Sequence, residues 1–92
     1  MKKCLKIVFS APVPEQFLQI VQKQARSLNV EGTMAVMPAE RVVKIIAAGD
    51  KESVDQFLDA LYKDGAKAGI HDITAESMLK EKDYRGVFRI IE

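Results

Sequence analysis

The chain lacks several features that would assign it to a particular class of protein. It has a single cysteine, so no internal disulfide can form and a reducing compartment is expected. Its 14 basic and 13 acidic residues leave a net charge of +1, whereas proteins that bind nucleic-acid backbones carry clustered basic charge. No run approaches the roughly 18 apolar residues of a membrane span. The composition therefore predicts a cytoplasmic protein with neither a nucleic-acid nor a membrane partner.

Residue types that bind metals or drive catalysis are also scarce. His71 is the only histidine, and on a strand its neighbour Asp72 would point to the opposite face, so the two do not form a general-base pair. Cys4 has no evident activating partner and is expected to be an inert thiol. Histidine, cysteine and carboxylate at ligand spacing are too few for a metal centre. The sequence therefore predicts no metal and no cofactor.

What the chain does have is the composition of an ordinary globular domain. Apolar residues make up 48% of its 92 residues and charged residues 29%. This length leaves no room for a second core, so residues 1–92 are expected to form one domain with a modest core.

The N-terminal half reads as a strand, a helix and a hairpin. Leu5, Ile7 and Phe9 alternate with Lys6, which is strand periodicity. Pro14 suits the first turn of a helix, whose apolar residues recur at helical spacing until Asn29 provides a left-handed stop. Two further strands are predicted as a hairpin, over residues 32–37 and 41–48.

The C-terminal half reads as a helix and two strands. Gly49 breaks the preceding strand and Asp50 is a good N-cap. Val54, Phe57, Leu58 and Leu61 form an amphipathic stripe, and Gly65 is expected just past the helix end. Strands are predicted over residues 70–75 and 87–91, with a short strand or irregular segment near 78–86.

This order of elements predicts an α+β fold. Strand, helix, strand, strand, helix and strand form a ferredoxin-like split βαββαβ sandwich, in which an antiparallel sheet carries two helices on one face.

Several framework motifs resemble the acylphosphatase family over nearly the whole chain. Leu28-Asn29-Val30-Glu31-Gly32 is similar to the family's Leu-Gly-Leu-x-Gly turn, with Asn29 in place of a glycine. The stripe around Phe57 resembles the family's second helix, and Phe88-Arg89-Ile90 resembles its C-terminal Phe-x-Ile. The resemblance implies the family's ferredoxin-like fold.

The resemblance fails at the family's catalytic loop, Gly-x-Val-Gln-Gly-Val-x-Phe-Arg. The stretch of equal length here matches only at Phe17, and Leu18 replaces the catalytic arginine. Val36 stands where the family has the asparagine that orients the attacking water. No catalytic residue therefore carries over. The resemblance assigns the equivalent of the phosphate loop to Ser10, Ala11, Val13, Glu15, Gln16 and Phe17.

The loop composition opposes an anion cradle. Pro12 and Pro14 have no N–H to donate, and Pro14 removes the freedom of a loop glycine. Leu18 removes a guanidinium matched to phosphate, and a charged hydrogen bond of that kind is worth about 1.5–3 kcal/mol. Glu15 adds a repelling carboxylate. The chain is therefore expected to lack conventional acylphosphatase activity.

The predicted open face of the sheet offers another surface. If Leu5, Ile7 and Phe9 face the helices, then the other face carries Val8, Val42 and Ile46, with Lys6 and Lys44 among them. Two hypotheses follow. The chain is a binding or interaction module for a small molecule or a protein, with a homodimer through the open face as one form. Alternatively it is an active acylphosphatase, or a related hydrolase, that uses other catalytic residues.

Overall fold

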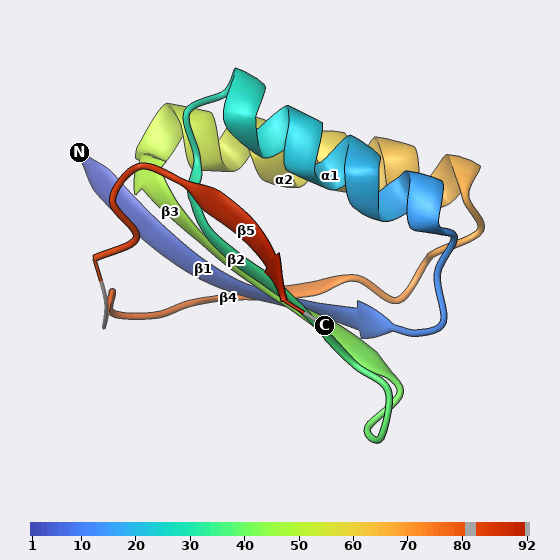
Figure 1. The fold of residues 1–92 in the computed structure, drawn as a ribbon. Coiled ribbons are helices and arrows are strands. Elements are labelled where there is room, and N and C mark those ends of the chain that lie inside the picture. The colour runs from blue at the N-terminus through green and yellow to red at the C-terminus, as the bar shows by residue number, and fades with distance from the viewer. Residues whose placement is uncertain (81–82, 92) are drawn as a thin grey trace.

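Two helices cover one face of a five-stranded sheet and leave the other face without a helix (Figure 1). The structure is a computed structural model that describes residues 1–80 and 83–91. Its elements are β1 (Lys2–Ser10), α1 (Glu15–Ser27), β2 (Glu31–Met37), β3 (Val42–Asp50), α2 (Lys51–Lys67), β4 (Thr74–Ser77) and β5 (Phe88–Ile91).

The strands lie in the order β4-β1-β3-β2-β5. The pairs β4–β1, β1–β3 and β3–β2 are antiparallel, and β5 is added beside β2 in parallel. The predicted fold class is therefore confirmed, with a sheet that is mixed at one edge.

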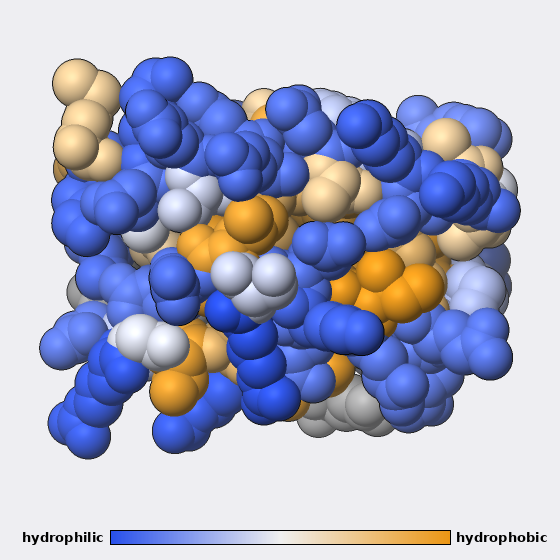
Figure 2. Space-filling view, turned by 90° about the horizontal axis from the view of Figure 1, so that it is seen from above, coloured by the Kyte–Doolittle hydropathy of each residue, from blue (hydrophilic) through white to orange (hydrophobic). Residues whose placement is uncertain are grey.

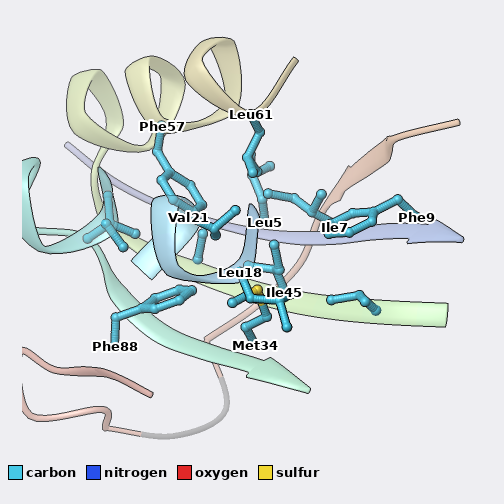
Figure 3. Close-up of a cluster of buried hydrophobic side chains, with 14 of the residues drawn as sticks. Leu5, Ile7, Phe9, Leu18, Val21, Met34, Ile45, Phe57, Leu61 and Phe88 are labelled. Carbon is cyan, nitrogen blue, oxygen red and sulfur yellow. The ribbon is translucent and has the colours of Figure 1, made fainter. Parts of the chain in front are cut away.

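The core lies between the helices and the sheet, where the alternation of β1 placed it. Leu5, Ile7 and Phe9 are at most 4% exposed, while Lys6 and Val8 between them are half-buried on the open face. The helices contribute Val21, Phe57 and Leu61, which point into the same cluster (Figure 3). Burying one side chain of this size stabilises the fold by about 1.5–3 kcal/mol, so this cluster holds the two layers together.

The second helix runs further than the sequence predicted. It ends at Lys67, and Gly65 is buried inside it. A Cβ on Gly65 would lie 2.9 Å from Ile73 Cδ1 and 3.2 Å from the carbonyl oxygen of Ile70. The glycine therefore allows the returning chain to approach the helix, and the left-handed residue past the helix end is Gly69 (φ +81°).

The same close approach explains why the fourth strand begins late. Ile70 and Ile73 both pack against the core, which a strand could not achieve at that spacing because its side chains alternate. Pairing with β1 starts at Thr74, not at residue 70 as predicted.

The third strand also runs further than predicted, through Gly49 to Asp50, because Lys3 and Lys2 of β1 pair with those residues. Asp50 takes the N-cap position of α2, but its side chain makes no capping hydrogen bond. It forms an ion pair with Lys2 instead, at 3.0 Å.

The segment between β4 and β5 is irregular where the structure describes it. The Met78 N–H donates to the Cys4 carbonyl (3.0 Å), and the Gly86 N–H donates to Glu31 Oε2 (2.8 Å). Lys80 also pairs with Glu31. Hydrogen bonding from Lys80, followed by that from Gly86, lowers the pKa of Glu31. These contacts attach both ends of the segment to the sheet.

Candidate functional site

The loop that joins β1 to α1 holds the residues that the resemblance assigns to the family's phosphate loop. It leaves the sheet at Ser10, and α1 begins at Glu15, directly after Pro14. Phe17 anchors the helix start, because its ring packs edge-on against Phe9 with the centroids 5.6 Å apart. Ala11 and Val13 pack against the core, while Glu15 and Gln16 are exposed.

The first N–H groups of the loop are bonded within the molecule. The Ser10 N–H donates to Asp72 Oδ2 (3.0 Å), and the Ser10 hydroxyl donates to the same oxygen. The Ala11 N–H donates to the carbonyl of Arg41 (2.8 Å). An incoming anion would have to displace these acceptors before it could use either donor.

Asp72 also places a negative charge beside the loop. The Ser10 hydroxyl is the largest cause that lowers the pKa of this carboxyl below its ordinary value of 3.8, and the Ser10 N–H lowers it further. Asp72 is therefore ionised at neutral pH, and with Glu15 it gives this end of the molecule two carboxylates. Like charges oppose the binding of a phosphate.

The two positions assigned to the family's catalytic residues contribute to packing. Leu18 is 8% exposed and points into the buried cluster beside Met34 and Ile45 (Figure 3). Val36 lies on the helix side of β2, opposite Val43, and also packs against the core. The structure thus brings both positions together as parts of one apolar core.

The sequence did not predict two residues that lie near the loop. Asp72 comes to Ser10 from 62 positions away, and Arg41 reaches Ala11 because β3 begins beside the end of β1. Asp72 was expected on a strand with its neighbour His71, but both lie exposed before β4. No local motif indicates either contact. The β1–β3 pairing, once known, would have revealed Arg41.

The remaining candidates are consistent with structural roles. Cys4 is buried and His71 is exposed. Within residues 1–80 and 83–91, no three histidine, cysteine or acidic residues are grouped so that they could hold a metal ion. In that same part of the chain, neither helix has the length and apolar character needed to cross a bilayer.

The fold and the framework motifs define a class of protein. The family model for acylphosphatase matches residues 16–90, so the chain belongs to the acylphosphatase family. The match begins at Gln16 and leaves the preceding part of the loop, residues 10–15, outside it. No curated protein sequence gives a significant match.

Solved structures share the fold. An acylphosphatase from Bacillus subtilis is 20% identical, with a TM-score of 0.81 and full coverage of both chains. One from Coxiella burnetii is 21% identical, with a TM-score of 0.79 over 97% of this chain and 92% of that one. Full-length HypF, solved with phosphate and nucleotide bound, is 17% identical with a TM-score of 0.79; this chain covers 12% of its length. At such identities the likeness extends to the fold alone.

Proposed function

We propose that this acylphosphatase-family domain does not hydrolyse acyl phosphates in the family's way and serves as a binding or interaction module. The observation that carries the proposal is the burial of Leu18 in the core, at the position that the resemblance assigns to the catalytic arginine. A guanidinium could not be supplied from that position without rebuilding the core.

The loop backbone supports the same conclusion. Ser10 and Ala11 donate to acceptors within the chain, and Pro12 and Pro14 have no N–H. Removing one electrostatic donor from an enzyme site commonly costs about 10²–10³ in rate. An arginine, an asparagine and several loop donors are unavailable together, so hydrolysis at the family's rate is not expected.

A second candidate function rests on Arg41. Its backbone is hydrogen-bonded to Ala11, and its side chain forms no ion pair within the described part of the chain. A non-standard hydrolase could recruit this guanidinium to the loop. The carboxylates of Asp72 and Glu15 at the same end of the molecule oppose this alternative.

The test is hydrolysis of acetyl phosphate by purified protein, with an active acylphosphatase as the positive control. We expect a rate within about tenfold of buffer alone. Saturable turnover that is abolished by Arg41→Ala would overturn the proposal and identify the replacement guanidinium. Lys63→Ala, an exposed change on α2, is the matched control.

Two further parts of the proposal concern the cellular location and the oligomeric state. We place the domain in the cytoplasm because its single cysteine needs no oxidising compartment. The homodimer through the open face stays a prediction, and light scattering over a concentration series tests it.

A further inference from the structure

Each row of residues across the open face of the sheet combines polar and apolar side chains. Strand register places Lys6 opposite Ile46, which lies opposite Thr33, and Thr33 lies beside Arg89 of β5. The next row holds Val8, Lys44, Ala35 and Ile91. No helix covers these rows (Figure 1). The opposite side, which the helices cover, has a largely hydrophilic surface with scattered apolar patches (Figure 2).

The irregular segment before β5 turns part of this face into a hollow. The hollow has a volume of about 410 Å³ and is lined by Lys6, Lys44, Ile46, Ile91, Met78 and Tyr84, among others. A second hollow of about 290 Å³ shares Thr33, Tyr84 and Ile91 with it, so the two are contiguous around the tyrosine. Small-molecule sites commonly measure about 300–1,000 Å³ and combine apolar walls with a few polar groups.

Among residues 1–80 and 83–91, two basic side chains on this face lack the ion pairs that the others make. Each acidic residue that the strands place there has a lysine partner: Lys2–Asp50 at 3.0 Å, Lys6–Glu76 at 2.9 Å and the Lys80–Glu31 pair. Lys44 and Arg89 have no ion pair within residues 1–80 and 83–91. Asp83, which lines the second hollow, accepts a hydrogen bond from the Arg85 N–H (2.8 Å).

The two cations that have no ion pair among the described residues border different hollows, Lys44 the first and Arg89 the second. Lys44 and Arg89 lie on strands that β2 separates. Ideal sheet spacing places their Cα atoms about 12 Å apart. Lys44 is half-buried, so its stem covers apolar surface while its ammonium can reach a ligand. A second copy of the chain would bring the same excess of positive charge against this face. An anion complements it.

We propose that this hollow binds a small amphipathic anion. Its carboxylate, sulfonate or phosphate pairs with Lys44, and its apolar body lies against Ile46, Met78 and the ring of Tyr84. This inference rests on the proposed binding role and names the chemical class of the ligand. It also places the ligand on the sheet face opposite the helices, away from the loop that follows β1.

The test uses anilinonaphthalene sulfonate, a fluorescent aromatic anion, with the full chain. We expect saturable binding at one site, weakened about tenfold by Lys44→Gln and further by Lys44→Glu. Lys23→Glu makes the same charge change on the exposed side of α1 and is expected to leave the affinity unchanged. Raising NaCl from about 50 to 500 mM should weaken binding to the wild type more than to Lys44→Gln. Circular dichroism confirms that each variant is folded.

The outcomes separate this inference from the proposed function. Absence of binding, or equal affinity in folded wild type, Lys44→Gln and Lys44→Glu, overturns the anion site and leaves the absence of hydrolysis standing. Turnover of acetyl phosphate overturns the proposed function whatever the dye does. If uncharged Nile red binds as tightly as the anionic dye, and the Lys44 substitutions do not change its affinity, the hollow is only an apolar surface. That result overturns the inference. A single-stranded oligonucleotide that binds while the dye does not also overturns it.

Discussion

The β1–α1 loop and the open face of the sheet differ in how they use their polar groups. In the loop, the Ser10 and Ala11 N–H groups are bonded internally and Leu18 is buried. On the open face, Lys44 and Arg89 have no ion pair among the described residues and border a hollow. The family resemblance directs attention to the loop, whereas the proposed anion site lies on the sheet. The proposed anion site therefore rests on a hollow and a lysine without an ion pair among the described residues, and not on position in the family.

The largest expected effect comes from restoring the family's arginine. Leu18→Arg should destabilise the fold by about 3 kcal/mol or more, because it places an unpaired charge at a core position. It should not restore hydrolysis, since Pro12, Pro14 and Glu15 remain. Urea unfolding and the acetyl phosphate assay measure the two effects.

Leu18→Met is the matched control, because it keeps the volume and should cost less than about 1.5 kcal/mol. A Leu18→Arg protein as stable as the wild type would mean that position 18 is not part of the core. One that hydrolyses acetyl phosphate would mean that the loop is still a working cradle.

A charge placed on the open face should have a smaller effect on stability. Ile46 is half-buried there and lies opposite Lys6, so Ile46→Glu can form a cross-strand pair and should cost only about 1 kcal/mol. The same change should abolish dye binding, since it adds a carboxylate within the anion site. Urea unfolding and dye titration are the measurements.

Ile46→Gln separates the added charge from the lost apolar contact and should retain part of the dye binding. If Ile46→Glu unfolds the chain, the open face is part of the core. If the wild type associates and Ile46→Glu has a lower oligomeric state, the homodimer gains support over the small anion.

The smallest expected effect concerns the tether between Ser10 and Asp72. The pKa of Asp72 is lower in the folded chain than its ordinary value of 3.8, so the ionised group stabilises the fold above that pH. The contribution is lost as the pH falls through the folded pKa. Asp72→Asn should therefore lower Tm slightly at pH 7, and the difference from the wild type should shrink below about pH 4.

Thermal unfolding at a series of pH values measures this difference. Asp59→Asn, an exposed change on α2, controls for the loss of one carboxylate. A difference between wild type and Asp72→Asn that grows on acidification would contradict the tether.

The framework was predictable because its signals are local. Phe57 and Leu61 share a helical stripe, and the alternation of Leu5, Ile7 and Phe9 assigned the two faces of β1 before any partner was known. The errors came from long-range contacts. Gly65 looked like a helix stop because nothing local indicates that Ile73 packs against it.

The candidate site was predictable only in part, for the same reason. The motif comparison assigned the loop and Leu18 to the family's phosphate site, which stays a prediction. The alternation of β3 placed Lys44 and Ile46 on the open face. The approach of Arg41 and Asp72 to the loop depends on strand pairing and on the chain after α2. The wall that Met78 and Tyr84 add to the hollow depends on an irregular segment without a sequence pattern.

Backbone amide chemical shifts measured by NMR during a titration with anilinonaphthalene sulfonate test the central claim most directly. The anion site predicts that the largest shifts fall on Thr33, Ala35, Lys44 and Ile46, with little change in the loop at Val13, Glu15 and Gln16. Largest shifts at those loop amides, with the open face unchanged, would contradict it and return the ligand site to the family's loop.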